Sequence, residues 1–117
     1  MENEVADLLV GYLNASAEFS GTMGEVFPLV ADEGTEAPYA VYRIDESNNE
    51  TKDGAERFLA SVILVFPPKQ YAAALGMKNT VKAVLSDTEF YYQFSDTGFD
   101  EDTQSIVSIV SFQITST

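Results

Sequence analysis

The stretch VFPLVADEGTEAPYAVYRI, residues 26–44, decides the fold. It opens with a short apolar run at residues 26–30, passes through an acidic loop that contains Gly34, and ends in the segment Tyr39–Ile44. Pro38 stands immediately before that segment, and a residue without a backbone N–H suits the first position of a strand or an edge. Aromatic and β-branched residues favour a half-buried pleated surface, so the stretch predicts two strands joined by a loop.

The rest of the chain is expected to complete a single domain around this stretch. Its 117 residues, 45% of them hydrophobic, suffice for one buried core. The formal net charge is -13, from 19 acidic and 6 scattered basic residues. Nucleic-acid-binding surfaces need clustered Lys and Arg, so we expect no specific nucleic-acid binding. The N-terminus MENE is acidic, and no apolar run approaches the roughly 18–20 residues of a membrane span, so we expect no export signal and no membrane partner.

The side chains that usually carry proton-transfer and thiol chemistry are missing. The chain has no His and no Cys, which removes the commonest general base, the thiolate nucleophile and the usual transition-metal ligands. A phosphate-binding G-x-x-x-x-G-K-[ST] loop is also missing from the sequence. We therefore expect no enzymatic activity, no cofactor, and no catalytic or metal-binding residue.

Two segments have the apolar spacing of amphipathic helices, residues 4–18 and residues 69–86. The stripe of the first consists of Val5, Leu8, Leu9, Tyr12 and Leu13, and that of the second of Tyr71, Ala74, Leu75, Val81, Val84 and Leu85. Residues 20–24 are expected to break the first helix. Pro67-Pro68 is expected to start the second, in which Gly76 predicts close packing on the sheet or on the first helix.

Five segments have the composition of strands: residues 25–29, 39–46, 56–66, 89–96 and 103–115. The third has apolar side chains on both faces, which predicts helices on one side and protein or a partner subunit on the other. The element order is then α-β-β-β-α-β-β. The economical arrangement is an α+β domain with a mostly antiparallel or mixed sheet of four to five strands and two helices packed on one face.

Two short motifs near the C-terminus have known functions in other settings. Asp96-Thr97-Gly98 matches the aspartic-protease triplet, but that chemistry needs two such aspartates sharing a proton. Asp100-Glu101-Asp102 offers oxygen ligands for a hard cation such as Ca²⁺, but its spacing does not fit an EF-hand loop. We interpret the triplet as part of a hairpin turn and the acidic run as a solvated loop tip.

Aromatic side chains are dense over residues 90–99. Phe90, Tyr92 and Phe94 alternate with Tyr91, which predicts a strand whose aromatics enter the core and leave one tyrosine exposed. The alternative is a protein–protein contact, because large rigid aromatic side chains anchor interfaces.

Several segments, taken in order, resemble the small tail-completion or tail-terminator proteins of long-tailed phages, a family often labelled as a domain of unknown function (DUF3168). They are a leucine-bearing N-terminal helix, the run at residues 26–30, the P-Y-hydrophobic-hydrophobic-Y form of residues 38–42, Asp53-Gly54 before a long strand, the YAAAL helix at residues 71–75, and Phe112 in the last strand. The chain departs from the family in Pro67-Pro68 and in its strong acidity.

The resemblance implies a structural virion protein that caps the tail tube and mediates its joining to the head. Members of this kind look like ring formers, often hexamers. The implied partners are therefore other copies of this chain, the tail-tube protein and the head–tail connector. The implied location is the tail of a phage or prophage virion, with assembly in the host bacterial cytoplasm. An acidic lumen in such a ring would lower its affinity for the phosphates of passing DNA.

Residues expected at these interfaces lie mainly on loops, which carry contacts more often than cores do. They are Asp32, Glu33, Glu36, Asn48, Asn49, Asp53, Tyr91, Asp100, Glu101 and Asp102. A second hypothesis for the same acidity is a small acidic protein-binding module, an inhibitor of the DNA-mimic type. Such mimics need acids spaced like phosphates on one exposed face, whereas the acids between residues 32 and 53 are spread over loops and a strand.

Overall fold

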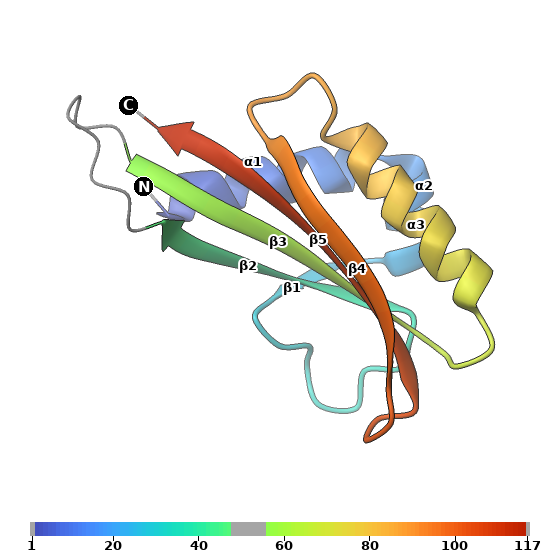
Figure 1. Cartoon of the computed structure of the whole chain (residues 1–117). Helices are drawn as coiled ribbons and strands as arrows, with labels where there is room; N and C mark the ends of the chain where they lie inside the picture. The colour runs from blue at the N-terminus through green and yellow to red at the C-terminus, as the bar shows by residue number, and fades with distance from the viewer. Residues whose placement is uncertain (1, 48–55, 117) are drawn as a thin grey trace.

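A computed structural model describes residues 2–47 and 56–116, which are organised around one five-stranded sheet (Figure 1). The strands are β1 (Val26–Pro28), β2 (Tyr39–Ser47), β3 (Glu56–Phe66), β4 (Tyr91–Asp100) and β5 (Ser105–Ser116). Their order across the sheet is β1-β2-β3-β5-β4, in which β1 runs parallel to β2 and the other neighbours are antiparallel. The predicted α+β class with a mostly antiparallel, mixed sheet is confirmed.

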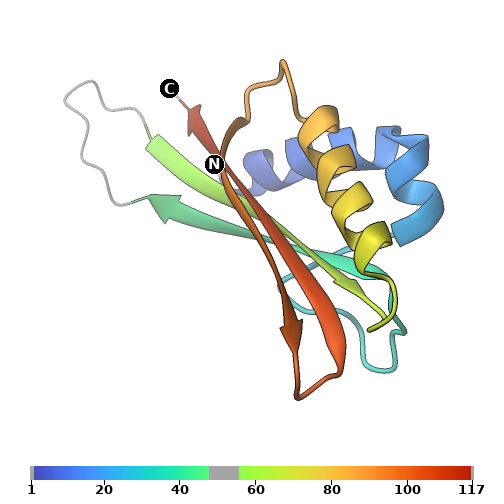
Figure 2. The ribbon, with the colours of Figure 1, turned by 45° about the vertical axis from the view of Figure 1, so that its right-hand side comes forward.

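Within the part of the chain that the structure describes, three helices, and not the two expected, lie on one face of this sheet (Figure 1, Figure 2). They are α1 (Glu2–Ala15), α2 (Ala17–Met23) and α3 (Tyr71–Val84). None of the helices in the described ranges is long and apolar enough to cross a membrane.

The single N-terminal helix predicted at residues 4–18 is divided in two at Ser16. Ser16 has extended backbone angles (φ -84°, ψ 116°), and its hydroxyl accepts a hydrogen bond from the N–H of Phe19 at 3.2 Å. It is therefore the N-cap of α2. This new helix continues through residues that were expected to break it and ends at Gly24, whose φ of 67° suits glycine.

We expect loss of the Ser16 cap to destabilise the domain. Ser16→Ala removes the acceptor for the N–H of Phe19, which should lower the free energy of unfolding by about 1 kcal/mol. Ser16→Asp keeps an acceptor and is the matched control, expected within about 0.5 kcal/mol of the unmodified chain. Urea denaturation followed by circular dichroism measures both, and equal stability of the alanine variant and the unmodified chain would refute the capping role.

The core lies between the helices and one face of the sheet. The buried apolar side chains of β3 and β5 come from one alternating face of each strand: Phe58, Ala60, Val62, Leu64 and Phe66 from β3 and Ile106, Val110, Phe112 and Ile114 from β5. The helices contribute Val5, Leu9, Leu13, Phe19, Met23, Ala74, Met77 and Val81. Burial of this apolar surface is the main term that holds the helices on the sheet.

Three predictions about individual helix residues are wrong. Gly76 lies on the exposed side of α3, and a Cβ there would have nothing within 4 Å, so this glycine makes no close approach. Leu8 and Tyr71 are 38% and 55% exposed, because Leu8 lies at the margin of its stripe and Tyr71 opens α3.

The C-terminal hairpin differs from the prediction in its boundaries. β4 covers residues 91–100, not 89–96, because residues before it form a turn in which Asp87 has a φ of 61°. Asp96-Thr97-Gly98 lies inside β4, where Asp96 pairs with Ile109 and Gly98 with Val107, so its assignment to the hairpin turn is wrong. The turn is instead formed by residues 101–104, where Gln104 has a φ of 54°.

Candidate interaction surface

The edge strand β4 extends beyond the helix layer. Helix α3 packs over β5 and β3, and β4 is the strand beyond β5 at the margin of the sheet (Figure 1, Figure 2). Four large side chains of β4 are exposed: Tyr91 (68%), Tyr92 (44%), Phe94 (49%) and Phe99 (52%). Edge strands usually carry charges or are covered, so an edge rich in exposed aromatics indicates a contact surface.

The prediction that these aromatics enter the core and leave one tyrosine exposed is wrong. Phe90, which precedes β4, is 3% exposed and does enter the core. A β-bulge explains the position of Phe94, because Tyr92 pairs with Phe112 whereas Phe94 pairs with Ser111, so that Gln93 is an extra residue. Phe94 is thereby turned to the side of the sheet away from the helices, on the same side as Tyr91.

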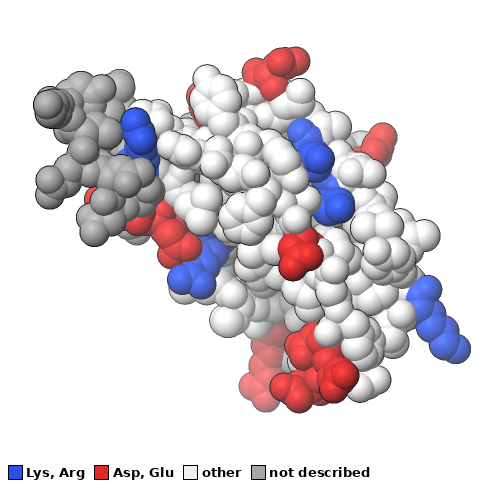
Figure 3. Space-filling view, in the orientation of Figure 1, with Lys and Arg blue, Asp and Glu red and all other residues white. Residues whose placement is uncertain are grey.

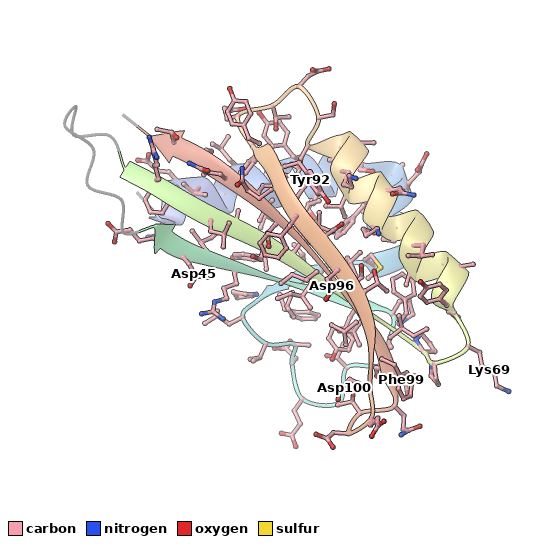
Figure 4. All side chains as sticks on the ribbon, in the orientation of Figure 1. Asp45, Lys69, Tyr92, Asp96, Phe99 and Asp100 are labelled. Carbon is pink, nitrogen blue, oxygen red and sulfur yellow. The ribbon has the colours of Figure 1, made fainter. Side chains whose placement is uncertain are left out.

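Tyr92, on the helix side of β4, is held by its own chain. Its ring packs edge-on against Phe112 with centroids 6.0 Å apart, and the ammonium group of Lys82 in α3 lies 4.3 Å from its centroid. Its hydroxyl lies 2.8 Å from Oγ of Ser95. Figure 4 shows Tyr92 between β4 and α3. The aromatics best placed to meet a partner are therefore Tyr91 and Phe94, whereas Phe99, opposite the core residue Ile106, lies on the helix side of β4 near its end.

The sheet face opposite the helices continues this surface inward. Its apolar residues on the two central strands are Leu59, Ile63, Val65, Val107 and Ile109, all partly exposed. Between them Oγ of Ser61 and Oγ of Ser111 share a buried hydrogen bond of 2.9 Å. Next to β4 the face is hollowed by about 370 Å³, with Asp96, Phe99 and Ile109 in the lining. Helices thus cover one face of β3, and the partner subunit expected on the other stays a prediction.

The acidic residues predicted as interface residues lie toward one end of the molecule. The β1–β2 loop carries Asp32, Glu33 and Glu36, and the β4–β5 turn carries Glu101 and Asp102. Both segments lie at the same end of the molecule in both ribbon views (Figure 1, Figure 2). Figure 3 shows carboxylates gathered at that end and largely uncharged surface above it. The predicted residues Asn48, Asn49 and Asp53 lie outside the described residues.

The acidic turn has a structural explanation. The two carboxylate oxygens of Asp100 accept hydrogen bonds from N of Asp102 at 3.1 Å and from Oγ1 of Thr103 at 2.9 Å. Asp100 therefore organises the turn as a local acceptor. Over the ranges 2–47 and 56–116, no group of three or more Asp, Glu, His or Cys side chains is arranged to hold a metal ion.

One pair of titratable groups has perturbed pKa values. The hydroxyl of Tyr12 in α1 donates a 2.6 Å hydrogen bond to Oε1 of Glu89. This bond raises the pKa of Tyr12 above its ordinary value and lowers the pKa of Glu89 below its own. The ring of Tyr12 also packs edge-on against Phe90 at 6.2 Å. The pair therefore links the first helix to the start of the hairpin on the helix side of the sheet.

The Tyr12–Glu89 bond predicts a measurable titration. Glu89 should support the fold above the pKa it has when unfolded and lose that effect as the pH falls through its folded value. Tyr12 should stabilise the fold below the pKa it has when unfolded, and this stabilisation should be lost as the pH rises through its folded pKa. In Glu89→Gln the pKa of Tyr12, followed by NMR at ring Cζ, should fall toward that of free tyrosine. Glu101→Gln, at the far end of the molecule, should leave it unchanged. An unshifted value in Glu89→Gln would contradict the bond.

Comparison with known proteins gives a likeness of fold. No protein-family model matches this chain, and no curated protein does. Among solved structures, a chain of one described as the virion of a native gene transfer agent (GTA) particle is similar. Its TM-score is 0.78 at 13% sequence identity, and the match covers 92% of this chain and 90% of that chain. The class of protein that this comparison defines is an α+β domain with the fold of that virion chain.

Proposed function

We propose that this chain is a structural protein of a phage or prophage virion. In this proposal it is a tail-completion or tail-terminator subunit that forms a ring at the end of the tail tube and mediates head–tail joining. The observation that carries the proposal is the fold shared with a chain of the gene transfer agent virion along nearly the whole length of both chains. The resemblance of the sequence to tail-terminator proteins rests on separate features, the leucine-bearing N-terminal helix and the short motifs between residues 26 and 112, and points to the same class.

The surface of β4 supports an assembly subunit. Tyr91 and Phe94 stand on an open edge strand, next to a sheet face formed by apolar side chains. When a second protein binds and removes such aromatic side chains from water, the free energy of the complex is lowered. A protein whose role is to join others through shape needs a surface of this kind.

The charge distribution supports a passage that does not grip DNA. The net charge is -13, and the exposed acids of the β4–β5 turn and of the β1–β2 loop lie at one end of the molecule. In a ring these ends would form an acidic rim, which repels phosphates. The same acidity is the basis of the DNA-mimic alternative, in which the chain would bind a nucleic-acid enzyme through its acidic end and not through β4.

The direct test is genetic. Deletion of the gene in a host that produces the particles should leave filled heads and free tails unjoined in electron micrographs and abolish transfer of DNA. The unmodified gene supplied in trans should restore both. Normal joined particles in the deletion strain would refute the proposed role, and a captured nucleic-acid enzyme together with normal particles would support the mimic.

A further inference from the structure

We infer that the subunits of the proposed ring meet head to tail along the sheet, with the β4 edge of one copy docked against the β1 edge of the next copy. The inference rests on the proposed function, because it names the surface through which this chain would bind a second copy of itself. It depends on three features of the described residues: exposed apolar groups at both edges, the direction of the edge strands, and the charges beside them.

The edge opposite β4 also presents apolar side chains to solvent. Leu29 and Val30, directly after β1, are 66% and 74% exposed. The N–H of Leu29 donates to the carbonyl of Tyr42 at 2.9 Å, which keeps Leu29 beside β2. Leu29 also has a φ of 63°, a left-handed conformation that is unfavourable for a leucine. The chain thus holds an exposed leucine in a strained conformation at this edge.

The directions of the strands suit this contact. β1 and β2 run one way, β3 runs the other way, β5 runs with β2, and β4 runs with β3. β4 and β1 are therefore opposed in direction at the two ends of the sheet. A second copy rotated about a ring axis would bring its β1 antiparallel to β4 of the first, and a contact between two different edges closes into a ring when the rotation permits.

The charges favour a contact between β4 of one copy and β1 of the next over a contact between the β4 edges of two copies. Asp96, in the middle of β4, and Arg43, on β2 just beyond its pairing with β1, both face the side away from the helices. The Arg43 side chain is 60% exposed, and its ion pair with Asp45 uses Nε at 2.9 Å, so its terminal nitrogens can reach a second carboxylate. A contact between two β4 edges would instead oppose Asp96 and Asp100 of both copies, and like charges across strands are destabilising.

Cysteine cross-linking tests the inference, because the natural chain has no Cys. The full-length double variant Val30→Cys with Gln93→Cys carries one thiol at each edge. Treated with a short bis-maleimide, it should give a ladder of dimers, trimers and higher species on a denaturing gel. Each single variant should give no more than a trace of dimer. The control double variant Val30→Cys with Asn79→Cys, whose second thiol lies on the exposed side of α3, should give no ladder.

Each other result overturns the inference. Strong dimer formation by Gln93→Cys alone would show a contact between two β4 edges. Absence of the ladder would show that these edges do not meet, whether the chain stays monomeric by light scattering or assembles through another surface. The deletion experiment is independent of this result, since a chain that restores head–tail joining without the cross-linked ladder keeps its proposed function and loses only this interface.

Discussion

Phe112→Ala should lower the free energy of unfolding by about 3–5 kcal/mol, the range found when a buried Phe is truncated. The Phe112 side chain is 1% exposed on β5, where it packs between the sheet and the helices and makes a T-shaped contact with the Tyr92 ring. Truncation would leave a cavity at the junction of β3, β5 and α3. Because a whole domain has about 5–15 kcal/mol of stability, this loss would leave a marginal protein. Urea denaturation monitored by tyrosine fluorescence measures the change.

Phe99→Ala is the matched control for this prediction. Phe99 lies on the neighbouring strand, pairs with Ile106 and is 52% exposed. Its truncation removes a ring of the same size but leaves no closed cavity, so the free energy of unfolding should change by about 1 kcal/mol or less. Similar losses for both variants would mean that the arrangement of β4 outside the core is wrong.

The double substitution Tyr91→Ser with Phe94→Ser should abolish self-assembly and head–tail joining while leaving the fold intact. These side chains are 68% and 49% exposed and lie on the side of β4 away from the helices. Loss of two aromatic anchors commonly costs an interface about 2 kcal/mol or more each, which is a loss of about 10³-fold in affinity. Light scattering of the purified chain and complementation of the deletion strain measure the two effects.

Tyr71→Ser is the control for the aromatic pair. Tyr71 is 55% exposed, between the values for Phe94 and Tyr91, but it opens α3 on the helix side of the molecule. It should assemble and complement like the unmodified chain. If the double variant complements fully, or if Tyr71→Ser fails to the same degree, β4 is not the assembly surface.

The strands and helices that bury one regularly spaced set of apolar residues could be predicted from the sequence. The alternation in β3 and β5 places one set of apolar residues inside, and a slip by one residue would expose that whole set, so the pattern defines these strands. The apolar stripe of α1 is defined in the same way by Val5, Leu9 and Leu13, all nearly inaccessible to solvent. The order of elements followed from these patterns and from the Pro and Gly positions.

The parts that depend on one residue in tertiary context could not be predicted. The break at Ser16 needs a serine hydroxyl to compete with helical backbone, and nothing in the apolar spacing marks it. The bulge at Gln93 reverses the faces of Phe94 and of the residues after it, and a strict alternation has no means of placing an extra residue. The exposed aromatic surface was therefore missed in the strand prediction, although Tyr91 was correctly placed outside the core.

Two pairs of hydrogen-bonded hydroxyl groups in the sheet limit how copies of this chain can combine. Ser61 and Ser111 join β3 to β5, and Thr97 and Ser108 join β4 to β5 through hydroxyl groups 2.8 Å apart. Each hydroxyl is satisfied in only one register, and Ser108 and Ser111 are fully buried, so a displaced β5 would leave polar groups unpaired in the interior. Domain swapping, in which copies would trade the C-terminal hairpin, would have to break the Ser61–Ser111 pair during the exchange, whereas the Thr97–Ser108 pair lies within the hairpin and would move with it. Copies of this chain are therefore expected to associate as folded monomers whose sheets lie edge to edge, without exchange of strands.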